Sequence, residues 1–202
     1  MRRAEERGDA ARVMQGRDVT PDAGSVPLLR ALHQRVFAAP EVRVLLDAAF
    51  EELVGELRER REPPHAARVI PIELFTDGLG SALADKVRLC RAFLLRRGRR
   101  MAVPEVHRNS VQRLVSYRGW GRIHAESPVE GRSRRGPRDL AARAIHSPDR
   151  GDPRPFPIEH SWDIVPAGVW HYPEAGGGAD WATVTFHSAS EDEIIDEYWE
   201  GE

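Results

Sequence analysis

The feature that most constrains the fold of this chain is a change of residue pattern at Pro63-Pro64. Before this pair, over residues 26–64, apolar residues recur at three- and four-residue steps, which is typical of amphipathic helices. After it, short segments rich in β-forming residues alternate with turns that contain glycine or proline. The sequence therefore predicts a helical extension over 26–64 and a β-rich domain over 65–202. Residues 1–25, which are polar and show no periodicity, are expected to form a disordered tail.

The second of the two predicted helices carries the clearest apolar stripe. It begins at Pro40, because proline is tolerated in the first turn of a helix, and it ends before Pro63-Pro64. The residues of the stripe are Val42, Leu45, Leu46, Phe50, Leu53 and Leu57. Such a stripe must be buried, either on the rest of the chain or on a second subunit. We expect a homodimer.

The β-rich part predicts a mainly β fold, built as a sandwich or a barrel. Tight turns are expected at 77–80 and at Gly119-Trp120-Gly121, and a short helix near 139–145 within a long excursion over 127–158. The expected strands cover 69–75, 87–95, 111–117, 122–126, 162–165 and 181–188.

Composition and charge exclude several classes of protein. Hydrophobic residues make up 41% and charged residues 31% of the 202 residues, which is a soluble globular composition. No apolar run approaches the ~18 residues of a membrane span, and the charged start lacks the apolar stretch of a signal peptide, so we expect a cytoplasmic protein. Arginines are spread along the chain rather than gathered on one element, which predicts no nucleic-acid partner. The single cysteine, Cys90, excludes an internal disulfide and a multi-cysteine zinc site.

Two segments carry residues suited to chemistry. In an extended segment Glu105 and His107 point to the same side, because side chains alternate along a strand. A carboxylate and an imidazole on one face are the beginning of a metal site, although a surface ion pair is the simpler alternative. In the second segment a predicted strand ends at Pro166-Ala167-Gly168, and His171 follows three residues after the glycine.

Together these segments resemble the two motifs of the cupin superfamily. The second motif, GxxxxxPxGxxHxxxN, is matched at Pro166, Gly168 and His171. The first motif, GxxxxxHxHxxxxExxxxxxG, is matched in spacing with changed letters, at Glu105, His107, Gln112 and Gly119. The resemblance covers about residues 66–190. It implies a double-stranded β-helix, or jelly-roll barrel, with an N-terminal α-helical extension.

The resemblance also implies a metal site inside the barrel. Its ligands, carried over by position, are Glu105, His107 and His171, with Gln112 as a weaker fourth. Two imidazoles and one carboxylate form the set used by non-haem Fe(II) oxygenases, so Fe(II) is the expected metal, with Mn(II), Ni(II) and Zn(II) as alternatives.

Other residues are candidates for the pocket around the metal. His187, on the face shared with Thr183 and Thr185, and Tyr117 are the expected acid–base groups. Each could equally be an ordinary core residue. His160, Tyr172 and Trp170 are further wall candidates, and His124 is undecided. We expect the acidic tail around 192–200 to form a solvated edge that packs against the barrel or a partner through Ile194, Ile195, Tyr198 and Trp199. His33, His65 and His146 are expected on the solvated surface.

Three functions fit these residues. The first is a non-haem Fe(II) oxygenase that acts on a small polar substrate. The second is a metal-dependent lyase, isomerase or cyclase without a redox step, in which Tyr117 or His187 moves a proton. The third is a non-catalytic cupin that binds a small molecule, which the changed letters of the first motif favour. The sequence does not identify the substrate.

Overall fold

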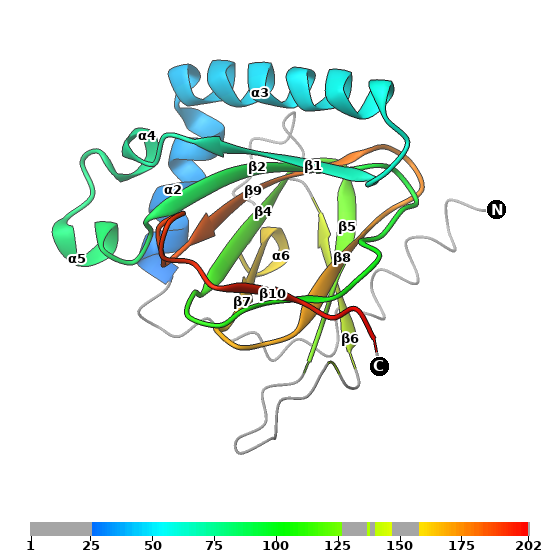
Figure 1. Cartoon of the computed structure of the whole chain (residues 1–202). Coiled ribbons are helices and arrows are strands. Elements are labelled where there is room, and N and C mark those ends of the chain that lie inside the picture. Colours follow the sequence, from blue (N-terminus) through cyan, green and yellow to red (C-terminus); the bar gives the residue numbers. More distant parts are fainter. Residues whose placement is uncertain (1–25, 127–136, 138–139, 147–157, 202) are drawn as a thin grey trace.

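The computed structural model describes residues 26–126, 137, 140–146 and 158–201 (Figure 1). The predicted tail over 1–25 and most of the predicted excursion over 127–158 lie outside the described residues. Ten strands form two antiparallel five-stranded sheets, with the orders β1-β2-β9-β4-β7 and β10-β3-β8-β5-β6. The strands are β1 (His65–Ile70), β2 (Leu89–Leu95), β3 (Glu105–His107), β4 (Gln112–Arg118), β5 (Trp120–Ala125), β6 (Ala141–His146), β7 (Trp162–Val165), β8 (His171–Ala175), β9 (Trp181–His187) and β10 (Asp196–Tyr198).

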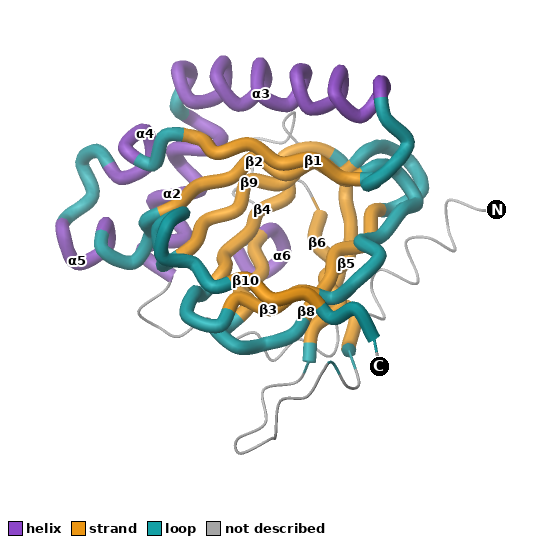
Figure 2. Tube along the Cα trace, viewed as in Figure 1, coloured by secondary structure: helices purple, strands orange, loops and turns teal. Residues whose placement is uncertain are grey.

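The strand order is that of a double-sheet jelly roll. Strands β2, β9, β4 and β7 lie side by side in one sheet, and β3, β8, β5 and β6 in the other, so the chain crosses repeatedly between the sheets. The tube view shows the two sheets facing each other (Figure 2). Cupins are among the proteins built on this architecture. The predicted fold class, a mainly β cupin-type barrel, is confirmed.

Two helices cover the outer face of the first sheet. Helix α2 (Val26–Ala38) precedes α3 (Pro40–Glu59), which lies across β1 and β2 (Figure 1). The predicted apolar stripe of α3 is buried in this contact: Phe50 is 1% exposed and stacks on Tyr117 of β4, with ring centroids 5.2 Å apart. The stripe thus packs within the chain and leaves the homodimer a prediction that rests on the resemblance alone.

Short helices complete the described fold. They are α4 (Glu73–Thr76), α5 (Ser81–Ala84) and α6 (Ile158–Ser161). The predicted strand over 69–75 is placed too late, because the strand β1 ends at Ile70 and the chain then turns into α4. In the described part of the chain, no helix is both long and apolar enough to cross a membrane.

Two predictions of local structure are wrong. The predicted helix near 139–145 is the strand β6, which pairs with β5 along its whole length. Only Ile145 of β6 is fully buried, so this segment has no apolar stripe that a helix could bury. Pairing with β5 therefore decides the structure of the segment. The predicted turn at 119–121 is confined to Gly119, whose φ of 73° favours glycine, and Trp120 already begins β5.

Candidate metal centre

The predicted ligands Glu105, His107 and His171 meet on the inner face of the second sheet. Glu105 and His107 lie two residues apart on β3, so both side chains point to the interior. Glu105 is paired directly with His171 of the neighbouring strand β8. The potential ligand atoms of the three residues all lie within 4.8 Å of one another. The resemblance to the two cupin motifs predicted this convergence, and the structure brings the three residues together.

The proline–glycine turn of the second motif leads from β7 into β8 and is hydrogen-bonded to β3. Gly168 has a φ of 75°, which favours glycine, and its N–H donates to the carbonyl oxygen of His107 at 2.8 Å. Val169 follows, and its carbonyl oxygen lies 3.1 Å from Nδ1 of His171. A carbonyl oxygen can only accept, so Nδ1 of His171 carries the proton and Nε2 keeps its lone pair. The turn therefore sets both the place of β3 and the tautomer of His171.

Both histidines keep one nitrogen available for a ligand. His107 and His171 are 3% and 1% exposed. Nε2 of each ring is buried and has no hydrogen-bond partner among the described residues. The carboxylate of Glu105 lies 3.5 Å from Nε2 of His171. Because buried polar atoms are nearly always paired, two such nitrogens beside a carboxylate fit a bound cation.

The three residues line a cavity of about 140 Å³ between the sheets. Its wall combines polar side chains, among them Arg91, Gln112 and Thr185, with apolar ones, among them Phe93 and Trp181. The other lining residues are His65, Ala67, Met101, Leu114, Ile123, Pro173, Thr183, His187 and Tyr198. A space of this size, lined by both kinds of side chain, suits a small molecule.

The first sheet supplies Gln112 and His187 opposite the three predicted ligands. These two residues are directly paired between β4 and β9. The ring of His187 packs edge-on against His107, with centroids 4.8 Å apart. Oε1 of Gln112 and Nδ1 of His187 are buried and have no hydrogen-bond partner among the described residues. The predicted inward face of β9 is confirmed, because Thr183, Thr185 and His187 all line the cavity.

Burial controls the charge of the centre. Burial lowers the pKa of His171 to about 3, with the neighbouring His107 acting in the same direction. Burial and the charge of His107 also lower the pKa of His187 well below its ordinary value. Burial raises the pKa of the Glu105 carboxyl. The rings of His171 and His187 are therefore neutral at pH 7, which is the form that binds metals.

Tyr117 lies on the other face of the sheet, and its predicted place in the pocket is wrong. Its hydroxyl donates to the carboxylate of Asp47 in α3 at 2.7 Å, among the residues that hold the helices. Gln112 and Leu114 of the same strand line the cavity, and Tyr117 is an odd number of residues away from both. Strand alternation therefore turns Tyr117 away from the site.

Other aromatic candidates also lie outside the cavity lining. Tyr172 stacks on His124, with centroids 4.5 Å apart, and Trp170 packs against Trp199 at 6.2 Å. His124 points away from the site and lies 2.7 Å from Glu174. The side chain of His160 lies outside the described residues.

The three histidines that were expected on the solvated surface are each half-buried and in contact with an aromatic ring. His65 lines the cavity, and its ring stacks on Phe93 with centroids 5.6 Å apart. His33 accepts a hydrogen bond from Nε1 of Trp162 at 3.1 Å. His146 stacks on Trp120, with centroids 5.5 Å apart.

Arg91, Asp196 and Tyr198 belong to the site, although the sequence did not mark them as site residues. Arg91 and Tyr198 line the cavity, and Asp196 contacts His107. Arg91 could have been found, because it interrupts a strand that otherwise reads as buried on both faces. Asp196 and Tyr198 belong to the acidic tail, and no local pattern marks two residues there as part of a site.

Comparisons with solved structures find jelly-roll proteins of the cupin type. An oxalate oxidase in complex with the substrate analogue glycolate shares 12% identity with this chain at a TM-score of 0.43, and the match covers 66% of this chain and 55% of that one. A salicylate 1,2-dioxygenase from Pseudoaminobacter salicylatoxidans shares 16% identity at a TM-score of 0.46, covering 78% and 36%. A vicilin from Capsicum annuum shares 16% identity at a TM-score of 0.48, covering 71% and 33%.

The chain thus spans about half of the oxalate oxidase and about a third of the other two proteins. No protein-family model matches the sequence, and no curated protein matches it either. The strand order itself assigns the fold: the chain is a cupin-type jelly roll. Its interior holds a candidate site for a divalent metal, formed by Glu105, His107 and His171.

Proposed function

We propose that this chain is a metal-dependent enzyme, a non-haem Fe(II) oxygenase that acts on a small polar substrate inside the barrel. The observation that carries this proposal is the buried convergence of Glu105, His107 and His171 within 4.8 Å. Two imidazole nitrogens and one carboxylate on one side of a site are the donor set of such oxygenases, and they leave other coordination positions open. A bound Fe(II) ion supplies Lewis acidity and redox activity toward dioxygen.

We propose that Arg91 binds the polar end of the substrate. It is the one arginine among the described residues of the cavity lining, and its side chain is 24% exposed. Its Nη1 forms a 3.7 Å ion pair with Asp196, and the guanidinium has further N–H groups that can bind a second anion. A planar guanidinium binds a carboxylate through two parallel hydrogen bonds, so a small carboxylate is the proposed substrate class.

The remaining wall would orient the substrate and exclude water. Phe93 and Trp181 offer apolar surface, and Trp181 is itself fixed because its Nε1 donates to the hydroxyl of Ser116 at 2.8 Å. The side-chain carbonyl oxygen of Gln112 has no hydrogen-bond partner among the described residues and can accept a hydrogen bond from a substrate hydroxyl. His187 lines the same cavity beside His107 and is the side chain that we propose for holding a proton next to the substrate.

Oxygen consumption tests the proposed reaction. The protein is loaded with Fe(II) under nitrogen, mixed with a panel of small carboxylates and then exposed to a known amount of O₂. We expect substrate-dependent uptake of O₂ by the wild type and by His124→Ala, whose ring lies outside the cavity. His171→Ala should show none. Uptake that is equal in His171→Ala and in the wild type would contradict the proposal.

A second candidate function keeps the metal and omits the redox step. Nδ1 of His187, which has no hydrogen-bond partner in the described part of the chain, favours this candidate, because a buried imidazole beside a substrate can accept and return a proton. The same panel under strict exclusion of oxygen separates the two candidates. Product formation without O₂ supports a lyase, isomerase or cyclase and eliminates the oxygenase.

A further inference from the structure

The C-terminal strand β10 runs alongside the two ligands of β3. Its register pairs Asp196 with His107 and Tyr198 with Glu105. Strand β10 is therefore the outermost strand of the second sheet, and it reaches the cavity, where Tyr198 is part of the wall. An acidic tail that the sequence places in solvent thus lies against the candidate metal centre.

Asp196 makes the closest contact to a predicted ligand. One of its carboxylate oxygens lies 2.6 Å from Nδ1 of His107, and its side chain is 20% exposed. The carboxylate oxygen of Asp196 accepts this hydrogen bond, so Nδ1 of His107 carries the proton and Nε2 is the nitrogen that remains for a ligand.

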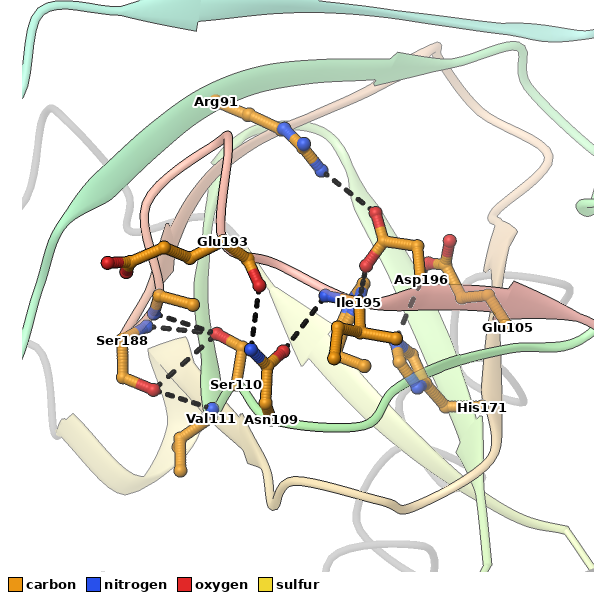
Figure 3. A network of polar contacts seen from close by, with 12 residues as sticks. Arg91, Glu105, Asn109, Ser110, Val111, His171, Ser188, Glu193, Ile195 and Asp196 are labelled. Carbon is orange, nitrogen blue, oxygen red and sulfur yellow. Dashed lines mark hydrogen bonds and ion pairs between the residues drawn. The ribbon is translucent and has the colours of Figure 1, made fainter.

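Arg91 contacts Asp196 itself, and Asn109 holds the segment that precedes it (Figure 3). Arg91 reaches from β2 to its second oxygen, at 3.7 Å. The preceding residue, Ile195, is held twice: its N–H donates to Oδ1 of Asn109 at 2.9 Å, and its carbonyl accepts from the backbone N–H of Arg108 at 2.8 Å. Nδ2 of Asn109 also donates to the carbonyl of Glu193 at 2.7 Å. The loop that follows β3 therefore anchors the segment that carries Asp196.

We propose that Asp196 is a positioning residue of the metal centre: its carboxylate holds the ring of His107 in one orientation and in the tautomer that leaves Nε2 free to bind the metal. This inference deepens the proposed function and rests on it. Partners that orient a metal-binding histidine through its other nitrogen typically contribute about ten- to a hundredfold to metal affinity.

Zinc affinity and the tautomer of His107 test the proposal. Zn(II) is titrated into metal-free protein against a coloured chelator, for the wild type, Asp196→Ala, Asp196→Asn and the matched control Glu197→Gln. Glu197 lies on the same strand and pairs with Arg108 on the outside. We expect Asp196→Ala to bind Zn(II) about ten- to a hundredfold more weakly than the wild type. Asp196→Asn should lose less, since an amide oxygen still accepts from Nδ1, and Glu197→Gln should match the wild type.

Nitrogen NMR of the metal-free protein gives a second readout, which a merely structural role would not move. In the wild type and in Glu197→Gln the proton of His107 should reside on Nδ1, and in Asp196→Ala this preference should be lost while circular dichroism shows an intact fold. Unchanged zinc affinity and an unchanged tautomer in Asp196→Ala would overturn the proposal. If Asp196→Ala fails to fold, Asp196→Ser replaces it, and the same zinc affinity and tautomer as in the wild type would overturn the proposal. A wild type that binds no Zn(II) would contradict the proposed function instead, and the tautomer comparison would still decide the role of Asp196.

Discussion

Acid should destabilise the metal-free protein through His171. The pKa of this residue is lowered from 6.5 to about 3 in the folded chain, chiefly by burial. Between these values the unfolded chain binds a proton at His171 and the folded chain does not, so unfolding takes up a proton and is favoured as pH falls. The stability that this group contributes is complete above its unfolded pKa and declines as pH falls below about 6.5. The slope approaches about 1.4 kcal/mol per pH unit, or about 2 kcal/mol between pH 7 and pH 5.

Urea unfolding with EDTA present, at pH 7, 6 and 5, measures this effect through tryptophan fluorescence. The variant His171→Gln cannot titrate at this position. Its unfolding free energy should therefore fall by about 2 kcal/mol less than that of the wild type between pH 7 and pH 5. The comparison uses the pH dependence of each protein, so any uniform destabilisation by the substitution cancels. An identical pH dependence in His171→Gln and the wild type would refute the conclusion that His171 is buried in its neutral form.

Three further predictions concern packing and the site. Gly121→Ala should lower the unfolding free energy by about 1–3 kcal/mol, because a Cβ there would lie 2.1 Å from the ring of Trp181. The control Gly55→Ala in α3, where a Cβ would meet nothing within 4 Å, should raise it by about 0.5–1 kcal/mol. The same change in unfolding free energy in both variants would contradict the packing of Gly121 on Trp181. Phe50→Ala should cost about 3–5 kcal/mol in urea unfolding if α3 covers the sheet as described, and a cost under 1 kcal/mol would argue against it. Tyr117→Phe should leave zinc affinity unchanged, since the hydroxyl of Tyr117 contacts Asp47 in α3. A weaker zinc affinity in this variant would show that Tyr117 contributes to the metal site.

Part of the candidate site could be predicted from the sequence because strand alternation and turn chemistry are local properties. Glu105 and His107 share a face through strand alternation, and the Pro166-Gly168 turn fixes the start of the strand that carries His171. The pairing of Glu105 with His171 joins segments more than sixty residues apart. Only the resemblance to a known pair of motifs predicted that contact, because nothing in either segment specifies the other.

The misplaced and missed residues have physical explanations. Tyr117 was assigned to the pocket although Gln112, a predicted ligand on the same strand, already fixed which residues face inward. The strand β6 was predicted as a helix because its alanines and arginines favour helices, whereas its pairing with β5 decides its structure. Asp196 belongs to an acidic run that reads as a solvated edge, and its role depends on a strand pairing that spans 89 residues.

Metal content tests the central claim most directly. The metal-free wild type is dialysed separately against Fe(II) under nitrogen, Mn(II), Ni(II) and Zn(II), and bound metal is measured by elemental analysis, beside His107→Ala, His171→Ala and the control His124→Ala. The account predicts one divalent ion per chain for the wild type and His124→Ala, and far less for the two ligand variants. A wild type that retains none of the four metals, or ligand variants that retain as much as the wild type, would contradict it and favour a barrel that binds small molecules without a metal.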